Sequence, residues 1–166
     1  MQFRKFFWIL TGLVPVFFVF SAVSAQAQSF SASADPSSAL SVPLADQMLP
    51  AKLNQLLAVP AASQPLVLQI GSHIMFQQAH IPGAQFVGPG SQPAALEALA
   101  RAVSFTSKKR LIVLYCGCCP WGRCPNVAPA YRKLRELGYT NVKVLYLASN
   151  FGDDWVAKGY KTQNGN

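Results

Sequence analysis

The chain has no cysteine outside one short stretch, although that stretch holds four: Cys116, Cys118, Cys119 and Cys124. A disulfide scaffold spreads its cysteines along the sequence, because bridges that close long loops stabilise a fold most. Any internal bridge here would close a loop of at most nine residues. The distribution therefore excludes a disulfide scaffold and indicates that the four thiols form a chemical site.

Several other site patterns are also lacking. The 166 residues include only six acidic residues and two histidines, and they contain no Ser-His-Asp arrangement, no phosphate-binding glycine motif and no spaced pair of carboxylates. Haem attachment needs C-x-x-C-H, and Pro120 stands where that histidine would be. The net charge of +8 is spread thinly apart from residues 108–110. This pattern favours a solvated surface that attracts small anions, and it disfavours a nucleic-acid partner.

The first 27 residues have the order of a secretory signal peptide. Arg4 and Lys5 precede an apolar run at 6–23, and small residues with two A-x-A-like cleavage positions follow within 23–27. We therefore predict a signal peptide at 1–27 and an exported protein, periplasmic or secreted. Removal of the signal peptide takes away Arg4 and Lys5 and lowers the net charge from +8 to +6. The alternative is an uncleaved membrane anchor, because the run is about long enough to cross a bilayer. Membrane contact is expected only in that case.

The rest of the chain is predicted to contain a leader, one domain and a short tail. Residues 28–45 are rich in Ser and Ala, which predicts a flexible leader. From 46 to 162 strands alternate with helices, which predicts an α/β domain with a central, mostly parallel sheet flanked by helices, and 163–166 form the tail. The predicted helices lie at 49–58, 73–79, 92–103, 126–137 and 151–160, the strands at 65–70, 110–115 and 141–147, and a turn with a short extended piece at 80–88.

The four cysteines follow the strand at 110–115 and precede the helix at 126–137. Ligands of open α/β sheets bind at the carboxyl ends of strands. Unpaired backbone amides and the positive end of the helix dipole bind anions there and favour a thiolate over a thiol. Arg123 adds a positive charge to the same loop. A cysteine in this loop is therefore a candidate nucleophile.

Residues 79–84, with the sequence AHIPGA, resemble the signature turn of rhodanese-like domains, usually written GHIPGA. Tyr115-Cys116 at a strand end, a later helix ending in LRELGY and a closing W…GY segment follow in the order found in that family. The resemblance covers about residues 46–162 and implies the family's three-layer fold. It also implies a cysteine that holds a sulfane sulfur as a persulfide and passes it to a thiophilic acceptor.

By this resemblance Cys116 is the expected nucleophile, and Arg123 is expected to aid anion binding. The donor would be a small sulfur-containing anion such as thiosulfate, or a persulfide, and the acceptor would be a thiol or cyanide. No cofactor and no metal are expected. The substrate-binding loop is expected to comprise Gly117, Pro120, Trp121 and Gly122.

The sequence departs from the family pattern in three ways, one of which is the presence of extra thiols beside the nucleophile, which simple sulfur transfer does not require. The strand that usually ends in Asp-Val-Arg reads Gln69-Ile70-Gly71, so the usual groups that brace the loop are lacking. The family's arginine often lies five residues after its cysteine, whereas Arg123 lies seven after Cys116 and five after Cys118. Cys118 is therefore an alternative nucleophile. Cys118, Cys119 and Cys124 are candidate nucleophiles, or thiols that resolve or relay a persulfide.

Two other interpretations of the cysteines stay open. Cys116 to Cys119 form a C-x-x-C after a strand, as in thioredoxin-like thiol-disulfide oxidoreductases. Thioredoxin-like domains also have a downstream cis-proline that faces the cysteines, whereas this sequence has no proline after Pro129. The four thiolates also suit Cu(I) or zinc, although tetrahedral ligation from one loop this short is awkward.

Two conspicuous residues outside the loop have predicted structural roles. We expect His80 to hydrogen-bond the backbone of its turn and Trp155 to pack in the core.

Overall fold

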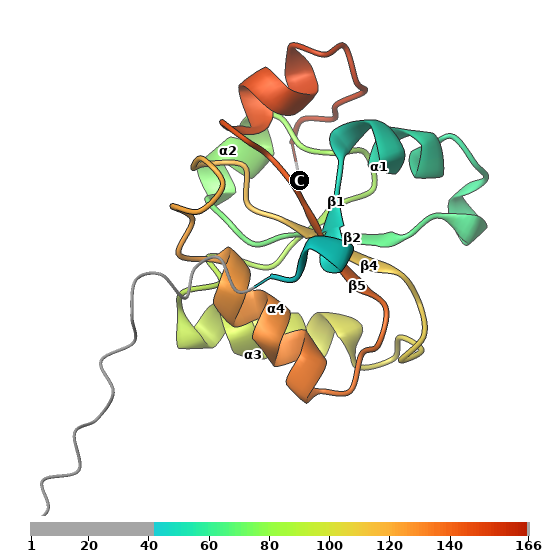
Figure 1. The fold of residues 1–166 in the computed structure, drawn as a ribbon, viewed down its shortest axis with the longest axis vertical. Helices are drawn as coiled ribbons and strands as arrows, with labels where there is room; N and C mark the ends of the chain where they lie inside the picture. The colour runs from blue at the N-terminus through green and yellow to red at the C-terminus, as the bar shows by residue number, and fades with distance from the viewer. Residues whose placement is uncertain (1–41, 166) are drawn as a thin grey trace, which may run out of the picture. The chain divides into compact units, whose positions relative to one another are not determined.

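The computed structural model describes residues 42–165 of the chain (Figure 1). Its five-stranded sheet has the order β1-β5-β4-β2-β3, and every neighbouring pair is parallel. The predicted α/β class is confirmed, and the sheet is wholly parallel. The strands are β1 (Gln47–Met48), β2 (Leu66–Gln69), β3 (Gln85–Phe86), β4 (Ile112–Tyr115) and β5 (Val142–Leu145).

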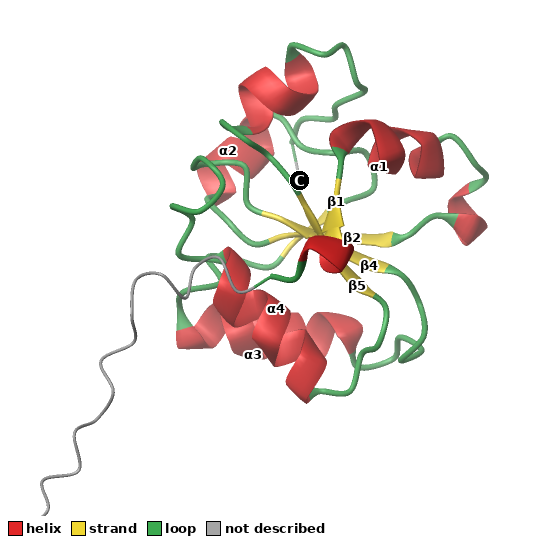
Figure 2. Cartoon of the chain, viewed as in Figure 1, coloured by secondary structure: helices red, strands yellow, loops and turns green. Residues whose placement is uncertain are grey.

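Helices cover both faces of the sheet and complete the three layers (Figure 2). Two of them lie on one face and the others on the opposite face (Figure 1). The first pair is α3 (Pro93–Val103) and α4 (Val127–Glu136); the opposite face carries α1 (Pro50–Leu57), α2 (His73–Gln78) and η4 (Gly152–Val156), a single wide helical turn. Within residues 42–165, no helix combines the length and the apolar character that crossing a membrane requires.

The apolar run before the cysteines forms the central strand, because β4 is buried at all four positions. Its side chains alternate between two cores. Leu114 packs with Leu99 of α3 and Leu134 of α4. Val113 packs on the opposite face with Trp155, which is fully buried as predicted. The end of β4 is thereby fixed between the two helical layers.

The packed part of the chain reaches into the segment assigned to the leader. Val42 is only 3% exposed and lies in the core. Asp46 accepts hydrogen bonds from the Tyr131 hydroxyl at 2.5 Å and from Lys143 Nζ at 2.8 Å. At the other end, Gln163 forms a backbone bridge with His80. The predicted signal peptide, and the leader up to residue 41, lie outside the described residues.

Candidate functional site

Cys116 is the first residue after the central strand β4, at the carboxyl edge of the sheet. The next segment, 117–126, leads into α4. Cys116 is 5% exposed, so its thiol lies beneath the loop and not on the surface. This is the edge at which parallel α/β sheets present their reactive groups.

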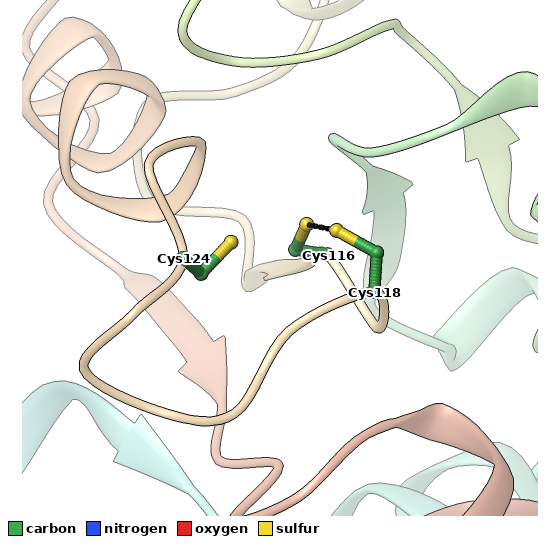
Figure 3. Close-up of side chains that lie close together, drawn as sticks. All are labelled: Cys116, Cys118 and Cys124. Atoms are coloured by element: carbon green, nitrogen blue, oxygen red, sulfur yellow. Dashed lines mark hydrogen bonds between the residues drawn. The ribbon is translucent and has the colours of Figure 1, made fainter.

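The structure brings the four thiols together, and Figure 3 draws three of them, Cys116, Cys118 and Cys124. Sγ of Cys116 lies 3.1 Å from Sγ of Cys118, which lies 3.2 Å from Sγ of Cys119. Cys124 comes from the far end of the loop, is 5% exposed and points toward Cys116. The sulfurs of Cys116, Cys118 and Cys124 all lie within 4.8 Å of one another, and all four cysteines are free thiols.

Asn126, which sequence reasoning did not select, completes this cluster. Its buried side chain donates from Nδ2 to Sγ of Cys116 at 3.2 Å, and its Oδ1 accepts the backbone N–H of Ser91 at 3.1 Å. An Asn at a helix start usually caps its own helix. Here the side chain makes no capping bond and instead links the thiol to the segment before α3. No local sequence signal distinguishes these two roles.

Gln69 and Gly71 support Cys116 where the family pattern has Asp and Arg. Gln69 is buried, donates from Nε2 to the carbonyl of Cys116 at 3.2 Å and accepts the N–H of Gly71 at 3.2 Å. A Cβ on Gly71 would lie 2.8 Å from the Cys116 carbonyl oxygen and 3.1 Å from its Sγ. The bracing that the sequence appeared to lack is therefore supplied by an amide, and the close approach leaves no room for an arginine.

The surroundings make the Cys116 thiol more acidic than the thiols of Cys118 and Cys124. A hydrogen bond from the Cys124 thiol is the largest cause of a lowered pKa at Cys116, and bonds from Asn126 and Cys118 add to it. Burial acts in the opposite direction and raises the pKa. The net result is a pKa of about 6 for Cys116. Burial, followed by the bonds to its neighbours, raises the pKa of Cys118. Donation to Cys116, followed by burial, raises the pKa of Cys124. Among these three thiols, Cys116 is therefore the one expected to be a thiolate near neutral pH.

Glycine sets the shape of the loop. Gly117 has φ +82°, and a Cβ there would lie 2.9 Å from Cβ of Phe151. The carbonyl of Gly117 accepts the N–H of Phe151 at 3.0 Å. Gly122 also has a positive φ, +83°. Two residues in this conformation turn the loop back on itself, which returns Cys124 to the neighbourhood of Cys116.

The predicted substrate-binding residues line this loop, but only some of its amides are occupied. Trp121 donates its N–H to the carbonyl of Leu147 at 3.1 Å, and Arg123 donates its N–H to Pro120 at 3.0 Å. Across residues 42–165, the N–H groups of Gly117 and Gly122 donate to no backbone carbonyl. These amides are available to an anion.

The remaining predicted residues lie further out. Arg123 and Pro120 are exposed, and the Arg123 side chain forms no hydrogen bond or ion pair with any residue of the described range. Trp121 is half-buried, with its ring 5.0 Å from the ring of Tyr146. His80 is buried and bonds the carbonyl of Phe76 through Nδ1 at 2.8 Å, the backbone role expected from the sequence.

A cavity of about 150 Å³ borders Cys116 and Gly117 on the side of α2 and η4. Its wall includes Tyr115, Phe151 and Val156, so it is largely apolar. A larger cavity of about 230 Å³, beside α1 and Pro82, contains no thiol. Of these two cavities, only the smaller has a cysteine in its wall.

The comparisons with known proteins agree with this architecture. The family model described as Rhodanese-like domain matches residues 49–147, more than half of the chain. No curated protein matches the sequence. The crystal structure of the Alr3790 protein from Anabaena sp. has a TM-score of 0.54 at 22% identity, over 71% of this chain and 82% of that one. Thiosulfate sulfurtransferase from Pseudomonas aeruginosa has a TM-score of 0.53 at 19% identity, over 79% of this chain and only 23% of that one.

Proposed function

Because this chain belongs to the rhodanese-like domain family, we propose that it is a sulfurtransferase or sulfur carrier with Cys116 as the nucleophile. The observation that carries the proposal is the position of this thiol. It lies at the carboxyl end of the central strand, with hydrogen bonds from Asn126 and from its neighbouring thiols. Hydrogen bonds to a thiolate stabilise it as a nucleophile and as a leaving group.

The proposed reaction has two displacements. The Cys116 thiolate attacks the outer sulfur of thiosulfate, the sulfur–sulfur bond breaks, and sulfite leaves with its electron pair. Cys116 then carries a persulfide, and the amides of Gly117 and Gly122, which donate to no backbone carbonyl of residues 42–165, are proposed to bind its outer sulfur. A thiol or cyanide attacks that outer sulfur, and the Cys116 thiolate leaves. Neither displacement needs an external oxidant or a cofactor.

Arg123 is proposed to act at longer range. Its side chain is exposed in the same loop, and it is not among the hydrogen-bond partners of Cys116 in the described range. A charge in that position raises the local concentration of anionic donors without contacting the reacting sulfur.

We also propose that the protein works after export, which is supported by the basic, apolar and small segments in residues 1–27. The mass of the chain recovered from a periplasmic extract tests the export proposal.

The test is the intact mass of the reduced protein after exposure to thiosulfate. We expect a gain of one sulfur atom that cyanide removes. Cys116→Ser abolishes this gain, whereas Cys119→Ser retains it, because the Cys119 sulfur bonds to that of Cys118 and lies outside the group formed by Cys116, Cys118 and Cys124. Retention of the cyanide-labile sulfur in Cys116→Ser would refute the assignment. No gain in the unaltered protein would refute sulfur transfer from thiosulfate.

The 3.1 Å contact between the sulfurs of Cys116 and Cys118 favours a second candidate function, thiol-disulfide exchange. In that case thiosulfate adds no sulfur, and a disulfide substrate removes two hydrogens from the protein. The same mass measurement distinguishes the two functions.

A further inference from the structure

Three of the four sulfurs converge on one point, and they come from both ends of the loop (Figure 3). The sulfurs of Cys116, Cys118 and Cys124 lie within 4.8 Å of one another, and the pair Cys116–Cys118 is 3.1 Å apart. A metal with bonds of about 2.3 Å, the length for zinc and sulfur, holds three coplanar sulfurs about 4 Å apart. Shifts of under about 1 Å therefore convert this cluster into a three-coordinate site.

The three sulfur ligands determine which metal ions this cluster prefers. Within residues 42–165, no His, Asp or Glu joins these three sulfurs, and the fourth thiol, Cys119, lies outside the group. Thiolate-only sites select soft ions such as Cu(I), and hard cations prefer oxygen. Structural zinc takes four protein ligands. A fourth ligand from water is disfavoured here, because Cys116 and Cys124 are each only 5% exposed.

From this cluster we propose that the chain binds one Cu(I) ion through the sulfurs of Cys116, Cys118 and Cys124. The short loop, which makes four-fold ligation awkward, suits three-fold ligation. Gly117 and Gly122, with their positive φ angles, turn the loop so that Cys124 returns to Cys116. Each thiol releases its proton as it binds the metal.

The outer shell of the cluster suits the negative charge of such a site. Asn126 donates from Nδ2 to Cys116 at 3.2 Å, and the backbone N–H of Cys118 also donates to Cys116. The backbone N–H of Asn126 donates to Cys124. Such N–H donors orient metal ligands and tune their affinity. They also hold Cys116 and Cys124 in place before a metal arrives.

This site goes beyond the proposed sulfur transfer and does not depend on it. The persulfide sulfur and the Cu(I) ion exclude each other, however, because both bind Sγ of Cys116. A persulfide on Cys116 would therefore block the metal, and bound Cu(I) would protect Cys116 from thiosulfate.

The experiment titrates the full, reduced chain with Cu(I) in the absence of oxygen, against a coloured Cu(I) chelator. We expect one Cu(I) per chain, with three sulfur neighbours by X-ray absorption. Cys118→Ser and Cys124→Ser should each weaken Cu(I) binding by more than about a hundredfold. The loss of a residue that only hydrogen-bonds a metal ligand already lowers metal affinity by about 10–100-fold, and the loss of a ligand itself should lower it further. Cys119→Ser is the matched control, with one thiol fewer in the same loop and unchanged affinity for Cu(I).

Three results would overturn the proposal: no Cu(I) bound in competition with the chelator, equal losses in Cys119→Ser and Cys124→Ser, or tighter binding of zinc with a light atom as fourth ligand. Circular dichroism and thermal melting check that the variants fold. Cys118 is half-buried, so Cys118→Ser remains informative if the buried Cys124→Ser does not fold.

Discussion

Replacement of Gly71 by alanine tests how tightly the strand end of β2 is packed against the nucleophile. The new Cβ would lie 2.8 Å from the Cys116 carbonyl oxygen, 3.0 Å from Nε2 of Gln69 and 3.1 Å from Sγ of Cys116. The first of these contacts is with backbone, which cannot rotate away. Overpacking of this kind costs about 1–3 kcal/mol. A Gly→Ala change otherwise gains about 0.4–1 kcal/mol by restricting the unfolded chain. We therefore expect the free energy of unfolding to fall by about 1–2 kcal/mol.

The matched control is Gly152→Ala. Gly152 also lacks a positive φ, and the nearest atom to its new Cβ is Oδ1 of Asn150 at 3.0 Å, a side-chain atom that accepts the N–H of Asp153 at 2.9 Å. This variant should lose less stability than Gly71→Ala, because its one close contact is with a side chain and not with backbone.

Urea denaturation measures the free energy of unfolding of both variants, and the rate of sulfur uptake from thiosulfate measures the site. A shift of the Cys116 thiol by a few tenths of an ångström should slow uptake about tenfold, given that 1 Å can cost about a hundredfold. If Gly71→Ala matches Gly152→Ala in stability and takes up sulfur at the parent rate, the close packing of Gly71 on Cys116 is refuted.

Two further substitutions test single interactions. Asn126→Asp keeps an oxygen for the Ser91 N–H but replaces the hydrogen-bond donor to Cys116 by a carboxylate. Sulfur uptake should slow by about 10–100-fold, because a hydrogen bond to a charged group contributes about 1.5–3 kcal/mol. An unchanged uptake rate would contradict this role of Asn126. Burial raises the pKa of Asp46, but bonds from Lys143 and Tyr131 outweigh it and hold the pKa below its usual value. The stabilisation is therefore present above the unfolded pKa near 3.9 and is lost as the pH falls through the folded pKa. Asp46→Asn should lower the free energy of unfolding at pH 7 by about 0.5–1 kcal/mol, with a smaller loss at pH 3, and equal losses at both pH values by urea denaturation would argue against it.

Much of the architecture could be predicted because it depends on local patterns. The apolar run at 110–115 predicts a central parallel strand without knowledge of its neighbours, and the strand that forms, Ile112–Tyr115, is buried at every position. The same pattern placed Cys116 at the carboxyl edge of the sheet. The strand β1 was not predicted, because two residues are too few to show any periodicity.

The details of the site depend on contacts between distant segments, which local patterns do not record. Gln69 reaches the carbonyl of Cys116 across 47 positions of sequence, and Asn126 reaches Ser91 across 35. Each residue is polar and unremarkable in its own segment. Only the pairing of β2 with β4 and the packing of α4 beside the segment before α3 give them their roles.

The order of the strands in the sheet has a consequence for the way the chain folds. Among residues 42–165, β1 is the first strand in sequence and pairs only with β5, the last: Gln47 lies opposite Val144. Contacts between such distant residues form slowly, because the loop between them must close first. A chain that emerges from the ribosome from its N-terminus therefore cannot complete this sheet until residue 145 is available. The edge formed by β1 is expected to assemble late, after β2, β4 and β5 have paired.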